Sequence, residues 1–195
     1  MLPSGIELIL ASKSPRRSQL LEMAGIPFTI KTKEVEEIYP EDLPALEVAP
    51  YLAQLKAKAC QDFLQTDQQV LLTADSVVVL DDVIYGKPRD KAHAQQILRR
   101  LSGRVHTVVT GICLKSKQRE LVRAAHAQVH FQHLTDTEID YYLDRYQPYD
   151  KAGSYAIQEW IGLCKVRRIE GTYDNIMGLP VSLVYESLSD GDWGL

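Results

Sequence analysis

Hydrophobic and polar positions follow two patterns along this chain, one typical of strands and one typical of helices. Unbroken apolar runs at residues 8–10 and 70–80 predict strands buried on both faces, as at the centre of an α/β sheet. We predict further strands at residues 28–32, 83–86, 105–114 and 121–131, and helices at residues 15–24, 46–65, 91–101 and 136–146. Because strands and helices intermix throughout, the expected class is α/β or α+β, built on a mixed central sheet.

Local signals mark where several helices begin and end. Ser14 is a good N-cap, Pro15 suits the first helical position, and Gly25 can end the helix in the left-handed conformation. Asp90 can cap the helix that follows it, and Thr135–Glu138 matches a capping box. These signals agree with the apolar periodicity, so they support the same boundaries.

Turn signals organise the rest of the chain. Asp81-Asp82 predicts a hairpin turn between the strands at 70–80 and 83–86. From Ala156 onward, glycines at Gly171 and Gly178 lead us to expect mostly strands and turns. We expect residues 189–195 to be a frayed tail.

The composition is that of an ordinary globular protein, with 45% hydrophobic and 25% charged residues. A chain of 195 residues can bury one sizeable core or two small lobes. No low-complexity linker or internal repeat divides it. We therefore treat residues 1–195 as a single domain with two lobes and no separable linker.

The net charge and the cysteine content limit which binding partners and which cellular compartment are expected. A net charge of −4 argues against general binding to nucleic acid or to a membrane surface. The three cysteines are far apart, without the spacing of a zinc site or a disulfide framework, which suits a reducing cytoplasm. No apolar run approaches the ~20 residues of a membrane span, and the N-terminus lacks the features of a signal peptide. The sequence does not decide between a monomer and a homodimer.

The first strand-to-helix turn is a candidate anion site. Backbone N–H groups of the first helical turn and the helix dipole both favour negative charge at that point. Lys13, Arg16 and Arg17 surround the same turn, although basic side chains are mildly unfavourable at a helix N-terminus. A small phosphate-bearing ligand explains this mismatch better than a solvated basic turn does.

Asp75 is the strongest candidate for chemistry. It lies in the middle of the apolar strand at 70–80, where a bare carboxylate would cost several kcal/mol. It must therefore be paired, bound to a metal or neutral, unless the strand ends nearby and the side chain caps another element. Lys56 falls within the apolar stripe of the helix at 46–65, formed by Leu52, Leu55, Ala59 and Phe63. Such a lysine either extends out to solvent or meets a negative partner.

Three weaker signals add to this picture. Lys87 stands beside a rigid Lys-Pro turn and can approach Asp75 across the predicted hairpin. Glu36 and Glu37 are typical of a solvated face, but together with Asp75 they could complete a magnesium site. The segment Gly153–Gln158 reads as a loop leading into a strand, and its Gln158 amide can both donate to and accept from a base edge. A metal site at the histidines of residues 126–133 is disfavoured.

Several motifs, taken together and in order, resemble the Maf (septum formation) proteins from Glu7 to Leu188. They are Leu10-Ala11-Ser12-Lys13-Ser14-Pro15-Arg16-Arg17, Ala74-Asp75-Ser76-Val77-Val78, Gly86-Lys87-Pro88, Leu101-Ser102-Gly103, Asp150-Lys151-Ala152-Gly153-Ser154-Tyr155-Ala156-Ile157-Gln158 and Gly171-Thr172-Tyr173-Asp174-Asn175-Ile176-Met177-Gly178-Leu179-Pro180. The resemblance implies a fold like that of inosine-triphosphate pyrophosphatases, a mixed sheet with two lobes around a cleft. It implies a metal-dependent pyrophosphatase that converts a nucleoside triphosphate to its monophosphate and pyrophosphate.

The resemblance also implies roles for individual residues. Asp75 corresponds to the family's catalytic acid position, and Arg16, Ser76 and Gln158 correspond to its substrate-discriminating positions. The segment Gly153–Gln158 looks like that of the branch acting on dTTP and UTP. The alternatives are the sister branch that acts on 7-methyl-GTP and a nucleotide-binding regulator of cell division without turnover.

The mechanism that we expect joins these assignments. The predicted catalytic residues are Asp75, Lys56 and Lys87, with Asp75 activating a water that attacks the α-phosphorus. The predicted substrate-binding residues are Ser12, Ser14, Arg16, Arg17, Ser76 and Gln158. Magnesium, with Mn²⁺ or Co²⁺ as substitutes, is expected on Asp75 with Glu36 or Glu37. The amide of Gln158 is expected to pair with the edge that thymine and uracil share.

Overall fold

The structure is a computed structural model that describes residues 5–189 and residue 193. Within these residues the strands are β1 (Glu7–Leu10), β2 (Thr29–Ile30), β3 (Gln69–Leu80), β4 (Val83–Tyr85), β5 (Val105–Lys115), β6 (Glu120–Phe131) and β7 (Val166–Glu170). The α-helices are α1 (Pro15–Met23), α2 (Val48–Ala59), α3 (Lys91–Leu101), α4 (Asp136–Tyr146), α5 (Trp160–Lys165), α6 (Tyr173–Met177) and α7 (Val181–Ser189). Short 3₁₀ turns cover Ala45–Glu47, Gln61–Phe63 and Ala152–Ser154.

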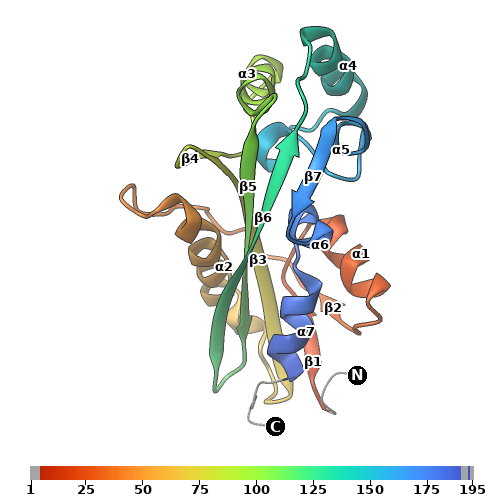
Figure 1. The fold of residues 1–195 in the computed structure, drawn as a ribbon. Coiled ribbons are helices and arrows are strands. Elements are labelled where there is room, and N and C mark those ends of the chain that lie inside the picture. The colour runs from red at the N-terminus through yellow and green to blue at the C-terminus, as the bar shows by residue number, and fades with distance from the viewer. Residues whose placement is uncertain (1–4, 190–192, 194–195) are drawn as a thin grey trace. The chain divides into compact units, whose positions relative to one another are not determined.

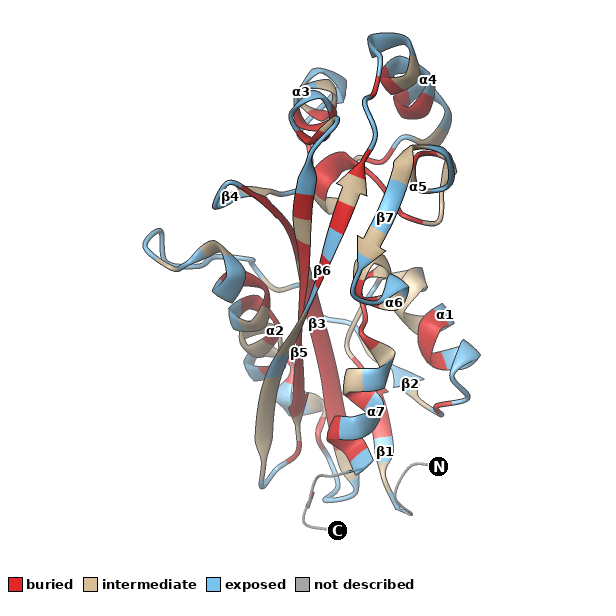
Figure 2. Ribbon diagram, in the orientation of Figure 1, coloured by how far each residue is buried: buried red, intermediate tan, exposed pale blue. Residues whose placement is uncertain are grey.

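The strands form one mixed sheet in the order β2-β1-β3-β5-β6-β7, with β4 paired to β3 beside this path (Figure 1). Strand β1 is parallel to both β2 and β3, whereas β4 and β7 are antiparallel to their neighbours. The predicted α/β class with a mixed central sheet is therefore confirmed. Strand β3 is buried along nearly its whole length (Figure 2), as its unbroken apolar run predicts.

The chain separates into two compact units. The first comprises residues 1–75, 110–125 and 178–195, and the second comprises residues 76–109 and 126–177. The boundary cuts β3 between Asp75 and Ser76, so that two neighbouring residues of one strand belong to different units.

In the first unit, the alternation of side chains along β1 and β3 decides which helix each face meets. Ile9 and Leu71 are register partners, and both pack with Ala53 and Ala57 of α2. Because successive strand residues point to opposite faces, Leu10 and its partner Leu72 face the other way. Helices α1 and α7 cover that second face (Figure 1).

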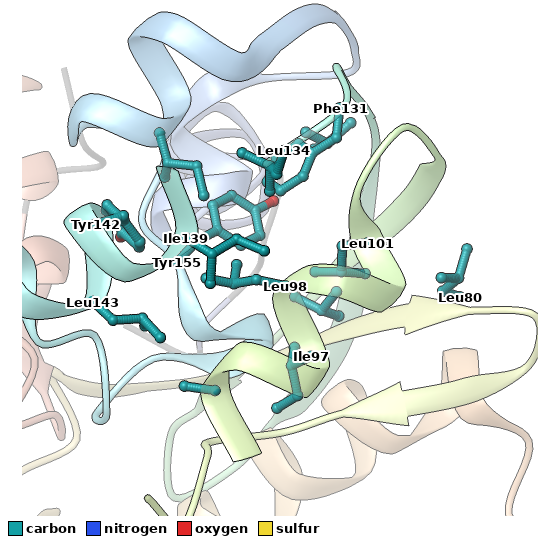
Figure 3. Packing of buried hydrophobic residues seen from close by; sticks show 14 of the residues in the cluster. Leu80, Ile97, Leu98, Leu101, Phe131, Leu134, Ile139, Tyr142, Leu143 and Tyr155 are labelled. Carbon is teal, nitrogen blue, oxygen red and sulfur yellow. The ribbon is translucent and has the colours of Figure 1, made fainter. Parts of the chain in front are cut away.

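The second unit has its own core between helices and the sheet. Ile97, Leu98 and Leu101 of α3 belong to the same buried cluster as Ile139 and Leu143 of α4 (Figure 3). Both helices begin where the caps predict. Asp90 accepts a hydrogen bond from the backbone N–H of His93, and Thr135 and Glu138 form the complete capping box.

The predicted hairpin is also confirmed, because Asp81 and Asp82 have φ values of 53° and 59° and connect β3 to β4.

Several predicted boundaries were wrong. The helix expected at 46–65 is limited to α2 and two flanking 3₁₀ turns, and the strand expected at 28–32 has only two residues. In α2 the fully buried positions include Ala53 and Ala57, whereas the predicted Leu55 and Ala59 are only half-buried. The reason is that small alanine side chains let the helix approach the sheet closely, which a search for large apolar residues overlooks.

The C-terminal third also differs from the expectation of strands and turns. Its described residues contain α5, α6 and α7, of six, five and nine residues, and the strand β7. Helices of one or two turns show too few apolar repeats to be distinguished from turns. The frayed tail predicted at 189–195 is wrong at Trp193, which is buried and donates from Nε1 to the carbonyl of Leu188 at 3.2 Å. The other positions after residue 189 lie outside the described residues.

Candidate active site

A lysine between two carboxylates lies in the first unit. The ammonium Nζ of Lys56 binds Oδ1 of Asp75 in a short hydrogen bond and lies 2.8 Å from Oε1 of Glu37. The side chains of Lys56 and Asp75 are only 16% and 11% exposed, whereas that of Glu37 is 40% exposed. Both alternatives left open by the sequence are thus decided: Asp75 is paired, and Lys56 meets negative partners.

The fold explains why these side chains meet. Leu71, Thr73 and Asp75 alternate onto the face of β3 that α2 covers. The hydroxyl of Thr73 donates to the carbonyl of Ala53 at 2.6 Å, which places this part of β3 against α2. Lys56 follows Ala53 by nearly one helical turn, and Asp75 follows Thr73 by one strand repeat. The two side chains therefore reach the same level of the packed layer.

Arg17 connects the start of α1 to the strand that carries Asp75. Its Nε donates to the carbonyl of Gly178 and its Nη1 to the carbonyl of Ala74, both at 2.8 Å. Burial lowers the pKa of Arg17, and the negative charge of Asp75 opposes that shift. The two donors on Nη2 make no hydrogen bond among the described residues, so they can still bind a phosphate oxygen.

The strand-to-helix turn is arranged as an anion site, with one difference from the prediction. Ser14 occupies the N-cap with extended backbone angles and Pro15 is in the first turn, but the Ser14 side chain makes no capping hydrogen bond. Instead, Oγ of Ser12 accepts from the backbone N–H of Ser14 at 3.1 Å and from Arg17 at 3.4 Å. The first turn of α1 contains no acidic residue, so its dipole has no local negative partner there.

Two of the predicted residues have other surroundings. Lys13 pairs with Glu34 at 2.8 Å, both side chains being well exposed, and this contact lowers the pKa of Glu34. Glu36 is exposed. The structure thus brings Lys56, Asp75, Glu37, Arg17 and Ser12 together in one unit, and Arg16 and Ser14 belong to the same unit.

Ser76, Lys87 and Gln158 belong to the second unit. Lys87 is exposed, beside the buried Pro88. The segment Gly153–Gln158 passes through a 3₁₀ turn and leads into α5, which corrects the expected strand. The side-chain Oε1 of Gln158 is buried and has no hydrogen-bond partner within the described residues. A buried amide oxygen of this kind is suited to accept from a ligand N–H.

His106 contacts Tyr155, which lies within this segment. Nε2 of His106 lies 2.8 Å from the hydroxyl of Tyr155, and both rings pack edge-on against Phe131. Burial lowers the pKa of His106 to about 3, so the imidazole is neutral at physiological pH. This buried, neutral environment indicates a structural role for His106.

The sequence reasoning missed Tyr142 of α4, whose hydroxyl binds both Ala156 and Glu159 beside Gln158. A signal for it exists: Tyr142 stands three residues after Ile139 on the apolar face of a well-capped helix. A buried tyrosine hydroxyl usually requires a polar partner, so the residue points to a buried polar contact.

The two carboxylates that contact Lys56 are the type of ligand that a hard cation prefers. Magnesium prefers one or two carboxylates together with water and substrate phosphates, and Glu37 and Asp75 supply two oxygen donors in one place. No group of three or more His, Cys, Asp or Glu side chains suited to a metal occurs within residues 5–189 and 193. His130 pairs with Glu170 at 2.8 Å, which accounts for one of the histidines set aside above.

The chain is similar to a protein family, to named relatives and to a solved structure. A family model described as "Maf-like protein" matches residues 7–191. A "dTTP/UTP pyrophosphatase" of Porphyromonas gingivalis is 47% identical over 94% of each chain. A protein of the same name from Phocaeicola vulgatus is 47% identical over 93% of this chain and 94% of its own. The solved structure of the Staphylococcus aureus Ham1 protein aligns with a TM-score of 0.48 at 15% identity, covering 64% of this chain and 71% of that one.

Among the described residues, none of the helices combines the length and the apolar character that crossing a bilayer requires.

Proposed function

This chain belongs to the Maf family, and we propose that it is a nucleoside triphosphate pyrophosphatase that hydrolyses dTTP and UTP to the monophosphate and pyrophosphate. The observation that carries the reaction type is the buried carboxylate of Asp75, which is bound by Lys56. The carbonyl of the preceding residue, Ala74, accepts a hydrogen bond from Arg17. A carboxylate among several cations suits a water-activating base beside a polyphosphate. The choice of dTTP and UTP as substrates follows the names of the relatives described above.

The triphosphate is proposed to bind at the start of α1. Its negative charge would be met by the N-terminal N–H groups of α1, by the Nη2 donors of Arg17 and by Arg16. Each charge-assisted hydrogen bond is worth ~1.5–3 kcal/mol. Lys56 and Lys87 are expected to add positive charge along the phosphate chain, which stabilises the pyrophosphate as it leaves.

Asp75 is proposed to orient and deprotonate the attacking water. The water oxygen forms a new bond to the α-phosphorus as its proton passes to the Asp75 carboxylate. The bond from the α-phosphorus to the bridging oxygen breaks, and pyrophosphate carries that oxygen away. Lys56 contacts the same carboxylate, so it fixes the direction in which Asp75 faces the water.

Asp75 and Glu37 are also the residues that we propose for a divalent metal, most simply Mg²⁺, with Mn²⁺ or Co²⁺ as substitutes. A bound cation there would supply Lewis-acid stabilisation of phosphate charge. Glu36 is the alternative to Glu37, and the contact between Glu37 and Lys56 favours Glu37.

We propose a cytoplasmic location because all three cysteines are free thiols. Cys60 and Cys113 are buried free thiols, and Cys164 is an exposed one. Burial raises the pKa of both buried thiols, Cys113 to about 12, so they are unreactive side chains of the core. An exposed free thiol without a partner is typical of reducing compartments.

A substrate panel tests the proposed function. Purified protein with Mg²⁺ is given dTTP, UTP, dCTP, purine triphosphates and 7-methyl-GTP, and phosphate is measured after added inorganic pyrophosphatase. We expect turnover of dTTP and UTP above the rest, with none in EDTA. Preference for 7-methyl-GTP would assign the chain to the sister branch instead. Binding of dTTP without any turnover would indicate a nucleotide-binding regulator.

Gln158→Ala is expected to weaken the choice of base without stopping the reaction. A bidentate amide–base pair contributes about 1–3 kcal/mol of discrimination, so the preference for dTTP over dATP should fall about tenfold or more. The ratio of kcat/KM for the two nucleotides, measured in competition, reports it. Gln128→Ala, at an exposed position of β6, is the matched control. An unchanged preference in Gln158→Ala would show that this amide does not read the base.

A further inference from the structure

The turn that carries Gln158 is tied at both ends to one hydroxyl group. A hydrogen bond of 3.1 Å from the backbone N–H of Glu159 to the carbonyl of Ala156 closes the turn, with Gln158 among its two central residues. The hydroxyl of Tyr142, from α4, accepts from the backbone N–H of Ala156 at 3.1 Å. The same hydroxyl donates to Oε2 of Glu159 in a short hydrogen bond. One oxygen atom thus joins the first and last residues of the turn.

Tyr142 is well placed to act as a fixed anchor. Its side chain is fully buried, and its ring stacks on that of Tyr146 one helical turn later, with 5.1 Å between ring centroids. Burial, followed by the hydrogen bond to Glu159, raises the pKa of Tyr142 well above its ordinary value. The hydroxyl therefore keeps its proton at neutral pH and remains able to donate and accept together.

Neighbouring elements restrain the same turn. A Cβ atom at Gly162 of α5 would lie 1.8 Å from the carbonyl oxygen of Ile157, so this helix packs directly on the turn backbone. Lys151, with a side chain only 11% exposed, lies 3.7 Å from the second carboxylate oxygen of Glu159. These contacts each touch one side of the turn, whereas the Tyr142 hydroxyl spans it.

We propose that Tyr142 is a positioning residue for base recognition, which acts by holding the turn that presents the Gln158 amide. This inference rests on the proposed function, in which Gln158 binds the thymine or uracil edge. The buried Oε1 of Gln158 has no hydrogen-bond partner within the described residues, so the backbone turn has to keep the amide in place. An amide held in its binding geometry loses little conformational freedom when the base binds, and a mobile one binds more weakly.

Tyr142→Phe in the full-length protein tests the proposal. Phenylalanine keeps the buried ring and its stack on Tyr146 and removes only the hydroxyl. We expect KM for dTTP and UTP to rise about tenfold, the usual scale of one or two lost hydrogen bonds, with kcat within about twofold. KM for purine triphosphates should not change. Partial unfolding would lower kcat for every nucleotide alike, so a selective KM shift separates positioning from structural damage.

Tyr146→Phe is the matched control, because it alters the stacked neighbour on the same helix. It should keep the wild-type KM values. If Tyr142→Phe fails to fold, Glu159→Ala removes one of the two contacts from the other side, and a smaller rise in KM for dTTP is expected. A folded Tyr142→Phe variant, or Glu159→Ala in its place, with unchanged KM for dTTP and UTP would overturn the proposal.

Hydrogen–deuterium exchange gives a readout that does not depend on activity. The amide of Ala156 should exchange about tenfold faster in Tyr142→Phe than in the wild type or Tyr146→Phe, because its acceptor is lost. Equal exchange rates in the three proteins would also overturn the proposal. Wild-type protein that hydrolyses neither dTTP nor UTP would contradict the proposed function, and the exchange experiment would then decide alone whether Tyr142 holds the turn.

Discussion

Asp75→Asn is expected to reduce hydrolysis of dTTP and UTP by about 10³-fold or more while the protein stays folded, since general-base catalysis contributes 10²–10⁴-fold. Asparagine has nearly the same shape but can neither accept a proton from water nor balance the charge of Lys56. Steady-state kinetics with a pyrophosphatase-coupled assay measures the loss. Near-normal turnover in this variant would remove Asp75 from the central role.

The stability of Asp75→Asn should change much less than its activity. Lys56 keeps a carboxylate partner, because Glu37 lies 2.8 Å from its ammonium and is partly open to solvent. We therefore expect the free energy of unfolding to fall by no more than about 3 kcal/mol, below the cost of leaving a fully buried charge unpaired. Urea denaturation checks this value.

The matched control is Asp82→Asn. Asp82 lies in the exposed hairpin turn that follows the same strand, at a φ of 59°, a conformation that asparagine also tolerates. Its activity and stability should equal those of the wild type. A comparable loss of activity in this control would mean that the assay reports general damage to β3 and not the chemistry of Asp75.

Gly111→Ala is expected to destabilise the protein strongly. A Cβ atom at this position of β5 would lie 2.3 Å from the backbone nitrogen of Pro50 and 2.4 Å from the carbonyl carbon of Ala49. Backbone atoms of α2 cannot yield as a flexible side chain can, so the helix would have to shift as a whole. We expect a loss of about 3 kcal/mol or more, at the upper end of overpacking costs.

Calorimetry and kinetics together test this prediction. For a chain of this size the melting temperature should fall by about 10 °C. Activity should also drop, because α2 carries Lys56 and its displacement would move the ammonium away from Asp75. Gly86→Ala serves as a control for stability alone, since nothing lies within 4 Å of the added Cβ atom. A Gly111→Ala protein as stable as the wild type would show that α2 and β5 can separate at low cost.

Much of the fold could be predicted because its signals are local. The apolar run of β3, the caps at Asp90 and Thr135 and the hairpin at residues 81–82 each depend on residues adjacent in sequence. The short helices α5, α6 and α7 could not be predicted in the same way. They have too few turns to show periodicity, and their stability depends on tertiary packing more than on intrinsic propensity.

By itself, the sequence determined that a carboxylate at residue 75 lies within a buried strand and that cations gather at the first helical turn. Both features follow from spacing along a single element. Only the tertiary structure decided which partners these groups take: Lys56 and Asp75 are 19 positions apart, and Arg17 binds carbonyls 57 and 161 positions away. Such pairings depend on how β3 packs between α1 and α2, and no local pattern encodes that packing.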